Sequence, residues 1–228
     1  QNYASINNLF KLHEPDIVYH VAAFKHVNMI ENNIINAIEN NFLASCNLID
    51  LAVKYKSEEF ILVSTDKAVE PTSIMGSTKR MAETYIQVIS QSNPSTKLSI
   101  VRFGNVINSS GSVIPLFKEQ IFNGGPVTVT HKDVNRYFMS IPEAVGLILD
   151  TSEISNGGEI FVLEMGNPIK ILDIAKKMIK LFKVSEEEVE IKFTGLKPGE
   201  KITEKLSVND KISPTQHEYI YVSKDEFM

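Results

Sequence analysis

The stretch Glu59-Phe-Ile-Leu-Val-Ser-Thr-Asp-Lys67 holds four apolar residues in a row, followed by two hydroxyls, a carboxylate and an amine. An apolar run of this length is typical of a strand that is buried on both faces. Similar runs occur at Asp16–Ala23 and Lys97–Phe103, and the stretches between the three runs carry apolar residues at helical spacing. This alternation of strand and helix predicts an α/β fold, with a parallel sheet and helices on both of its faces.

The helices and the remaining strands follow from the same patterns. We predict helices over residues 28–55, 75–91 and 113–123, the last of which ends at Gly124-Gly125. The final third contains shorter elements, namely strands at Val127–Thr130, Glu159–Leu163 and Ile191–Phe193 and amphipathic helices at Pro142–Thr151 and Ile171–Phe182. The tail after Ser207 is polar, and we expect it to be partly loose.

Composition excludes several classes of protein. The chain has 228 residues, of which 43% are hydrophobic and 22% charged, which is ample for a real core. The net charge of −5 comes without clusters of Lys and Arg, which argues against binding to nucleic acid or to an acidic membrane surface. Cys46 is the only cysteine, so an internal disulfide is impossible, and a reducing cytoplasm is the expected compartment. No apolar run approaches the ~20 residues of a membrane span, and we expect no membrane segment in this chain.

The polar residues after Val63 stand where open α/β sheets bind ligands, at the carboxyl end of a strand. A hydroxyl, a carboxylate and an amine at that edge can serve proton transfer. The alternative is a simple strand-to-loop cap, in which Thr65 and Asp66 bond to local backbone. Lys79 falls near the start of the next predicted helix and can return to the same edge, although a single Lys on a helix is more often solvated.

The string from Ser64 to Glu83 reads Ser-Thr-Asp-Lys-Ala-Val-Glu-Pro-Thr-Ser-Ile-Met-Gly-Ser-Thr-Lys-Arg-Met-Ala-Glu. It resembles the active-site segment of the extended short-chain dehydrogenases/reductases. Within them it is similar to the UDP-N-acetylglucosamine 4,6-dehydratases of capsular polysaccharide and flagellin glycan synthesis. The match continues in order through Ala22–Val27, Asn41, Arg102–Val106, Arg136–Met139 and Gly195–Lys201. Each motif is weak alone, but together they cover nearly the whole chain.

The resemblance implies a reaction in which tightly held NAD⁺ takes a hydride from C4 of the sugar and returns it to C6 after loss of water. It also implies a role for each residue of the segment. Thr65 would hydrogen-bond the C4 oxygen, and Asp66 would be the acid that assists departure of the C6 hydroxyl. Lys67 would be the base at C5. Lys79 would bind the nicotinamide ribose and, through its charge, lower the pKa of groups near C4.

Met75 departs from the general family pattern. Short-chain dehydrogenases carry Tyr-x-x-x-Lys, in which the tyrosine takes the proton of the C4 hydroxyl, and Met75 stands at that position, four residues before Lys79. A thioether cannot accept a proton at neutral pH. Either the enzyme is inactive or another group replaces the tyrosine. The large, membrane-anchored members of this branch also carry Met there, and the closer resemblance to them favours an active enzyme that retains configuration at C5.

The resemblance further divides the binding residues into two sets. The NAD side comprises Ala22, Ala23, Lys25, Asn41, Ser64 and Lys79. The substrate side comprises Asn105, Val106, Arg136, Glu200 and Lys201, with Arg136 and Lys201 as candidates for the diphosphate charge and Glu200 for a ribose hydroxyl. The bland alternatives are strand packing for the two alanines and surface ion pairs for the charged residues.

A dinucleotide-binding sheet opens with a Gly-rich turn of the Gly-x-Gly-x-x-Gly type, and the sequence contains none. We therefore expect Gln1 to follow the first strands of a Rossmann-type parallel sheet, which leaves a sheet edge free and favours a homo-oligomer. We predict that residues 1–125 form a partial NAD-binding domain with the catalytic segment. Residues 126–228 would form mainly a smaller α/β substrate-binding region.

The sequence thus predicts a UDP-N-acetylhexosamine 4,6-dehydratase that uses NAD and serves surface polysaccharide or glycan synthesis. Two alternatives stay open. One is a 4- or 5-epimerase or a reductase on the same scaffold, and the other is an inactive remnant that binds nucleotide sugars. The histidines and acidic residues show no ligand spacing, so we predict no metal site.

Overall fold

The computed structural model describes residues 2–92, 95–182, 189–208 and 211–224. Its centre is a six-stranded sheet with the strand order β1-β2-β3-β8-β12-β11. The first four strands are parallel, and the last two are antiparallel to their neighbours. Their bounds are β1 Ile17–His20, β2 Glu59–Val63, β3 Lys97–Arg102, β8 Ile160–Leu163, β12 Ile220–Ser223 and β11 Ile212–Pro214. The predicted α/β fold with a largely parallel sheet is confirmed.

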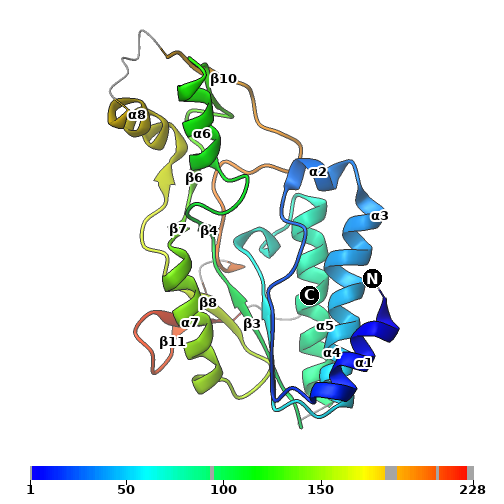
Figure 1. Cartoon of the computed structure of the whole chain (residues 1–228). Helices are drawn as coiled ribbons and strands as arrows, with labels where there is room; N and C mark the ends of the chain where they lie inside the picture. The colour runs from blue at the N-terminus through cyan, green and yellow to red at the C-terminus, as the bar shows by residue number, and fades with distance from the viewer. Residues whose placement is uncertain (1, 93–94, 183–188, 209–210, 225–228) are drawn as a thin grey trace.

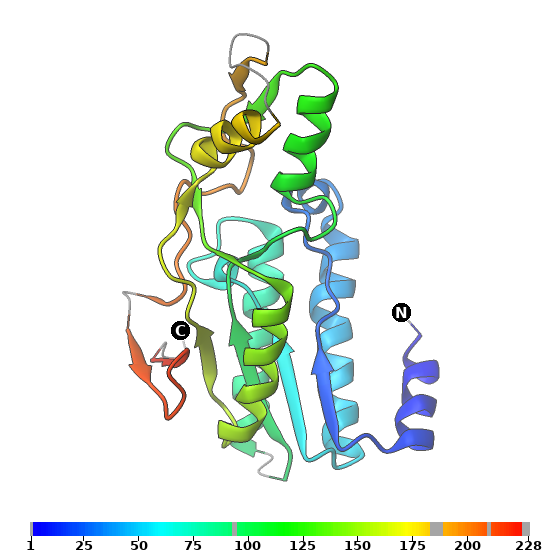
Figure 2. The same cartoon turned by 60° about the vertical axis from the view of Figure 1, so that its left-hand side comes forward.

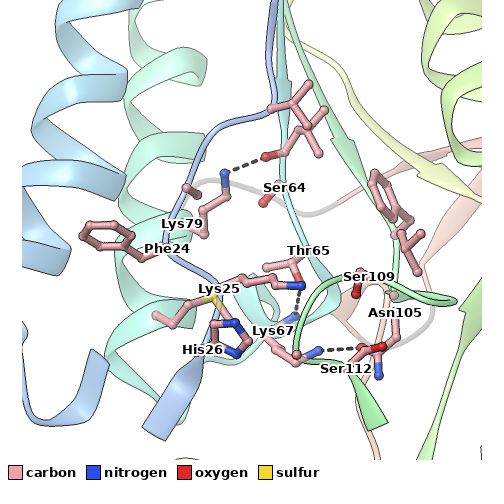
Figure 3. A pocket seen from close by; sticks show the side chains of 18 of the residues that line it. Phe24, Lys25, His26, Ser64, Thr65, Lys67, Lys79, Asn105, Ser109 and Ser112 are labelled. Carbon is pink, nitrogen blue, oxygen red and sulfur yellow. Dashed lines mark hydrogen bonds between the residues drawn. The ribbon is translucent and has the colours of Figure 1, made fainter. Parts of the chain in front are cut away.

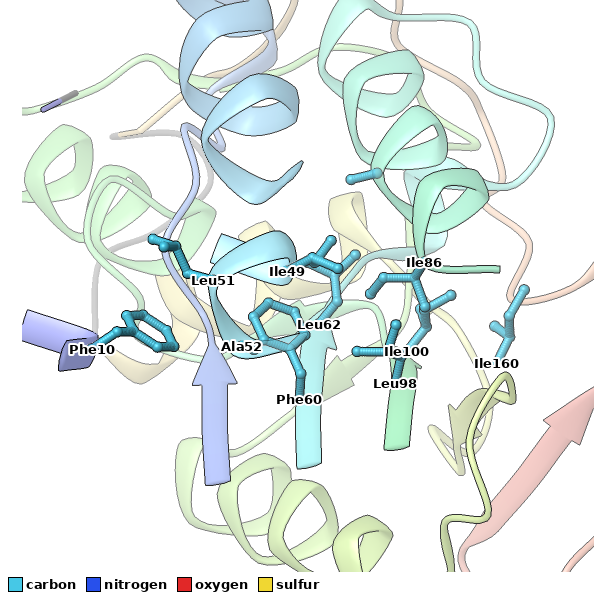
Figure 4. Packing of buried hydrophobic residues seen from close by; sticks show 11 residues of the cluster. Phe10, Ile49, Leu51, Ala52, Phe60, Leu62, Ile86, Leu98, Ile100 and Ile160 are labelled. Atoms are coloured by element: carbon cyan, nitrogen blue, oxygen red, sulfur yellow. The ribbon is translucent and has the colours of Figure 1, made fainter. Parts of the chain in front are cut away.

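Helices cover both faces of this sheet (Figures 1 and 2). One face carries α1 (Tyr3–His13), α4 (Ala44–Lys54) and α5 (Ile74–Ser92). Alternate residues of the strands point to the two faces, so Phe60 and Leu62 pack with this layer (Figure 4). Ile61 and Val63 point the other way and pack under α7 (Ile141–Ile154). The residues of β2 are all buried, as an apolar run between two helical layers must be.

Helix α7 shows how local sequence sets an element's start. Ser140 caps its N-terminus: the Ser140 hydroxyl accepts from the backbone N–H of Glu143, whose side chain accepts from the Ser140 N–H. Such a capping box satisfies two of the backbone donors that a helix leaves open at its N-terminus. Pro142 lies in the first turn, where its missing N–H costs nothing.

A smaller α/β unit lies beyond the carboxyl ends of the parallel strands (Figure 2). It contains α6 (Val113–Phe122), α8 (Ile171–Leu181) and the parallel pair β5 (Val127–Val129) and β10 (Ile191–Phe193), around a core of its own. A short ladder involves the segment after β3, because β4 (Asn105–Val106) pairs with β7 (Phe138–Met139). A second short ladder pairs β6 (Asn135–Arg136) with β9 (Ile169–Lys170). Residues 126–228 therefore contribute both to this unit and to the central sheet.

The single helix predicted over residues 28–55 is wrong. The segment divides into α2 (Val27–Glu31), α3 (Ile34–Ala37), a π-helical stretch (Ile38–Leu43) and α4. Asn33 interrupts the first part with a non-helical backbone conformation, and its side chain donates to the carbonyl of Met29. Asn favours such breaks because its amide competes for backbone hydrogen bonds. The π-helical stretch coincides with Asn41, whose side chain is used by the site.

The expectation of a loose tail after Ser207 is also wrong where the tail is described. β12 pairs with β8 and β11 pairs with β12, so both strands extend the central sheet. Ile220 is fully buried in the core under α7. This apolar residue holds the largely polar tail against the sheet. Across the described residues, no helix combines the length and the apolar character of a membrane span.

Candidate active site

A cavity of about 400 Å³ opens at the carboxyl ends of β1, β2 and β3 (Figure 3). Lys79, Thr65 and Lys67 surround the same hollow, although they come from a helix and from the end of a strand. Predicted site residues in its lining are Ala23, Lys25, Ser64, Thr65, Lys67, Met75, Lys79, Asn105 and Val106. The structure thus brings together residues from four separate segments at the edge where parallel sheets bind ligands.

Thr65, Asp66 and Lys67 form a connected set of hydrogen bonds. The Thr65 hydroxyl and the Lys67 ammonium both donate to Oδ1 of Asp66, each at 2.8 Å. Lys67 Nζ also donates to Oδ1 of Asn105 at 3.2 Å, which ties the end of β2 to β4. A short 3₁₀ turn over Asp66–Ala68 holds this shape, with the Thr65 hydroxyl accepting from the Lys67 N–H as its cap. A proton can pass between the three side chains without any atom moving far.

Asp66 itself lies behind the cavity wall. Its side chain is fully buried, and it is absent from the lining that Thr65 and Lys67 form. Its Oδ2 has no hydrogen-bond partner among the described residues. Gly104 closes over it, because a Cβ at that position would lie 3.3 Å from Oδ2 and 2.8 Å from the Cβ of Tyr137. Asp66 can therefore exchange protons with a bound molecule only through Thr65 and Lys67.

Lys79 reaches the cavity from α5 and is 4% exposed. Its ammonium donates to the carbonyl oxygen of Val63, the last residue of β2. Burial lowers its pKa to about 8, against the opposing effect of the Glu83 carboxylate. Met75 lies one turn earlier on the same face of α5, lines the cavity and packs against Ile30 and Ala37.

Sequence reasoning missed the network that holds this helix to the sheet. Glu83 is fully buried and accepts from the Ser64 hydroxyl at 2.6 Å and twice from the Arg102 guanidinium at 2.8 Å. Arg80 adds a third cationic contact at 3.2 Å. The signal for this network was Arg102 itself, since a charge inside an apolar strand needs a buried partner.

Gly76 is a second missed residue. A Cβ at this position would lie 2.2 Å from the carbonyl oxygen of Lys67. Only glycine lets α5 approach the turn at Asp66–Ala68 this closely, and this approach brings Met75 and Lys79 to the cavity. The sequence shows the glycine but not the carbonyl that it meets.

On the predicted NAD side, the Asn41 side chain is hydrogen-bonded to the backbone of Phe24. Its amide accepts from the N–H of Phe24 at 2.8 Å and donates to the carbonyl of Phe24 at 3.0 Å, which shapes the loop that carries Lys25 into the cavity. Ala22 is exposed and lies outside the lining, whereas Ala23 lies within it. His20, deeper in the same region, bonds through Nε2 to the Ser45 hydroxyl, and burial lowers its pKa to about 4, assisted by the charge of Lys79.

The predicted substrate side consists of two further cavities, of about 390 and 330 Å³. Both are lined by Asn105, Arg136 and Glu200, and the first also by Lys67, so they continue the first cavity as one groove. Arg136 is buried, and its guanidinium contacts Glu200 Oε1 at 3.3 Å. Lys201 is absent from both linings.

Glu204 is a third residue that sequence reasoning missed. It is 4% exposed and lines the cavity of about 390 Å³, which Lys67 also lines. Burial raises the pKa of its carboxyl, while the charges of Lys67, Arg136 and Lys201 act in the opposite direction. The repeated acidic residues of the Gly199 to Leu206 segment were the available signal, but only the fold shows which of them faces the groove.

Comparison with known proteins places the chain in a family. A family model described as polysaccharide biosynthesis protein matches residues 1–225. The capsular polysaccharide biosynthesis protein CapD of Staphylococcus aureus is 48% identical over 98% of this chain and 38% of its own length. UDP-glucose 4-epimerase of Rickettsia rickettsii is 34% identical over 93% of this chain and 61% of its own length. The chain thus spans less than two thirds of either relative.

Solved structures give the same result for the fold. The X-ray structure of Pen from Bacillus thuringiensis superposes with a TM-score of 0.87 at 33% identity, over 98% of this chain and 71% of that one. DesIV, the dTDP-glucose 4,6-dehydratase of Streptomyces venezuelae solved with NAD and TYD, superposes with a TM-score of 0.80 at 17% identity, over 90% and 68%. The Rossmann-type fold and the resemblance to the capsular polysaccharide branch of the short-chain dehydrogenases are confirmed. The chain belongs to the polysaccharide biosynthesis protein family.

Proposed function

We propose that this chain carries the catalytic centre of a UDP-N-acetylhexosamine 4,6-dehydratase. The observation that carries the proposal is the hydrogen-bonded set of Thr65, Asp66 and Lys67 in a groove that also holds Lys79. Elimination of water from a sugar needs an acid and a base on one substrate, and a hydroxyl, a carboxyl and an amine in contact supply both. The family is named for polysaccharide biosynthesis, which uses nucleotide sugars of this kind.

The residues around Lys79 fit the nicotinamide end of NAD. The Lys79 ammonium is buried and uses one donor on Val63, which leaves two donors for ribose hydroxyls. Ala23, which also lines this cavity, has only a small side chain and leaves room for a ligand. When bound, NAD supplies hydride acceptance from C4 and hydride return to C6. The chain's own task is to orient the sugar, move its protons and keep the positive charge of Lys79 next to the developing C4 oxyanion.

Thr65 and Asp66 take over the work of the tyrosine that Met75 replaces. The C4 hydroxyl donates to Thr65 Oγ1, and the proton that Thr65 already directs at Asp66 Oδ1 moves on to the carboxylate. Lys67 accepts the C5 proton through an amine that has already given its own proton to solvent, because Asp66 holds the proton from C4, and it returns that proton to C5 once the hydride has reached C6. The proton stored on Asp66 then leaves through Thr65 or Lys67 to the departing C6 hydroxyl. Every proton taken from the sugar at C4 is thereby returned in the water.

The two outer cavities accept the UDP portion of the substrate. Arg136 and Glu200 line both, so a cation is available for the diphosphate and a carboxylate for a ribose hydroxyl. Asn105 borders all three cavities and contacts Lys67, which sets the sugar between the diphosphate and the base. Of the residues predicted as substrate ligands, Arg136 and Glu200 therefore line the outer part of the groove, whereas Asn105 and Val106 lie beside the proton-transfer residues.

The experiment is substitution of the base in the protein that contains this chain. Lys67→Ala is expected to abolish dehydration of UDP-N-acetylglucosamine while UDP binding, measured by calorimetry, changes little. Lys205→Ala is the matched control, because its side chain is about half exposed. Dehydration by Lys67→Ala at a rate near that of the control contradicts the assignment of the base. UDP binding without NAD⁺ binding by the unaltered protein supports the alternative of an inactive remnant that binds nucleotide sugars.

A second candidate is a UDP-sugar 4-epimerase, favoured by the 34% identity to the Rickettsia relative of that name. An epimerase needs the hydride transfer but no acid and base at C5 and C6. It would leave Asp66 and Lys67 without a task. The mass of the product separates the two, since an epimerase conserves it and a dehydratase removes one water.

A further inference from the structure

Two segments of the chain lie side by side along the groove and are joined by hydrogen bonds and an ion pair. One is the catalytic-side segment, residues 68–73, which follows Lys67 directly. The other is the substrate-side segment, residues 196–206, which carries Glu200 and Glu204. Three contacts join them: Lys201 Nζ donates to the carbonyl of Val69 at 2.7 Å, Thr72 Oγ1 donates to the carbonyl of Gly199 at 3.1 Å, and Lys205 pairs with Glu70 at 2.9 Å. We call the first two contacts, which end on backbone carbonyls, the clasp; the exposed Lys205–Glu70 pair lies outside it.

Lys201 takes part in the clasp and lies outside the lining of the two substrate-side cavities. Its ammonium lies on the Val69 carbonyl and 3.6 Å from Oε2 of Glu204, and its side chain is 18% exposed. The two substrate-side cavities are lined by Arg136, Glu200 and Lys197, and Lys201 lines neither. A diphosphate held by those residues does not need its charge, although the sequence pattern suggested that it would.

The substrate-side segment is fixed on its other flank by Arg136. Its guanidinium donates to the carbonyls of Lys201 and Ile202 at 2.9 and 3.1 Å. Gly199 lets the segment touch the catalytic side closely, since a Cβ there would lie 2.7 Å from the Cβ of Ser73 and the residue has a φ of +75°. The UDP-facing residues and the residues after Lys67 are therefore joined through direct backbone contacts.

We propose that Lys201 is a positioning residue. It fastens the substrate-side segment to the catalytic-side segment, so that binding of UDP fixes the position of Lys67. The proposal rests on the UDP-sugar part of the proposed function. A shift of the reacting groups by about 1 Å can cost about 100-fold in rate, so the clasp acts on turnover more than on affinity. Loss of Lys201 should lower kcat strongly and leave the Kd of UDP nearly unchanged.

The test uses Lys201→Met, which keeps the length of the side chain and removes its donor. Lys205→Met is the matched control, because it breaks an exposed contact, 47% and 45% exposed at its two ends, between the same two segments. In the unaltered protein, UDP is expected to slow amide hydrogen exchange in both segments. In Lys201→Met the protection by UDP should persist in residues 196–206 and be lost in 68–73, with kcat about 10- to 100-fold lower. Lys205→Met should behave like the unaltered protein.

Several results would overturn the proposal. If Lys201→Met weakens UDP binding more than about 10-fold and reduces its salt dependence, Lys201 is a diphosphate ligand. If it lowers the melting temperature but keeps UDP protection of both segments and a normal kcat, its role is only structural. Should Lys201→Met fail to fold, Thr72→Val removes another bond of the clasp isosterically, and unchanged coupling in that variant also contradicts the proposal. The exchange readout needs UDP alone, so it separates failure of the clasp from failure of the dehydratase assignment, which shows as absence of product.

Discussion

Substitution of Gly76 by Ala tests how close α5 must lie to the turn at Asp66–Ala68. The added Cβ would stand 2.2 Å from the carbonyl oxygen of Lys67, and that oxygen belongs to backbone that cannot rotate away. Ordinary contact begins about 1 Å further out, so either α5 or the turn must move by roughly that distance. Overpacking of this kind costs about 1 to 3 kcal/mol, and helix propensity returns up to about 1 kcal/mol. We expect a net loss of about 1 to 2 kcal/mol of stability.

The functional effect of Gly76→Ala should exceed the effect on stability, because Lys79 and Met75 lie on the helix that moves and Lys67 on the turn. A misplacement of about 1 Å predicts a fall in kcat of about 100-fold. Gly146→Ala is the control, since it lies within α7 and a Cβ there meets nothing within 4 Å. Urea denaturation of both variants and steady-state kinetics measure the two effects. If Gly76→Ala is as stable as Gly146→Ala and turns over normally, the close approach has no importance and the reasoning fails.

Three further predictions follow from the site. Met75→Leu should keep most of the turnover, because Met75 packs against Ile30 and Ala37 and transfers no proton; a loss above about 100-fold in kcat would give the thioether a chemical role. The unaltered chain should lose stability as pH falls from 6.5 toward 4, because the pKa of His20 is lowered to about 4 in the folded state and only the unfolded state gains the proton over this range. The expected loss is on the order of 3 kcal/mol of unfolding free energy, measured by urea denaturation at several pH values. His20→Gln should make the stability nearly independent of pH over this range. Burial raises the pKa of Glu204, so ionisation of this carboxyl disfavours the folded state as pH rises above the ordinary carboxyl range. Glu204→Gln should therefore be more stable than the unaltered protein at pH 7 but not at pH 4. If the two proteins are equally stable at both pH values, the pKa of Glu204 is not raised.

Patterns within a few residues predicted much of the fold. The apolar runs around Phe60 and Ile100 became the central strands within one residue of their predicted ends, because burial on both faces leaves a strong local mark. The break at Asn33 and the π-helical stretch at Asn41 left no such mark, since apolar residues continue through both. Ile220 joins the core through pairing with β8, a contact between residues far apart in the chain that no local pattern contains.

The candidate site divides in the same way. Thr65, Lys67, Met75 and Lys79 line one cavity as the motif predicted, because their positions are set by one strand end and one helix. The burial of Asp66 behind them depends on the approach of Gly104, which lies between β3 and β4, and the partner of Arg102 depends on the packing of α5. Such contacts between segments decide which charged residues face a ligand and which hold the fold.

The contact of Lys201 with Val69 shows the limit most clearly. A lysine in a Gly-Glu-Lys motif has the charge that a diphosphate needs, and the local sequence offers only a carboxylate such as Glu204 as another partner. The fold supplies one in a backbone carbonyl 132 positions away in the chain. Backbone acceptors are invisible to any reading of side-chain patterns, and this is the reason that the predicted role and the observed contact differ.

The most direct test of the central claim is the mass of the sugar nucleotide formed from UDP-N-acetylglucosamine in heavy water, by the protein that contains this chain supplied with NAD⁺. If Asp66 and Lys67 are the acid and the base of an elimination, the product is lighter by one water and carries one deuterium at C5, and Lys67→Ala forms none of it. A product of unchanged mass, or the lighter product formed equally well by Lys67→Ala, contradicts the account.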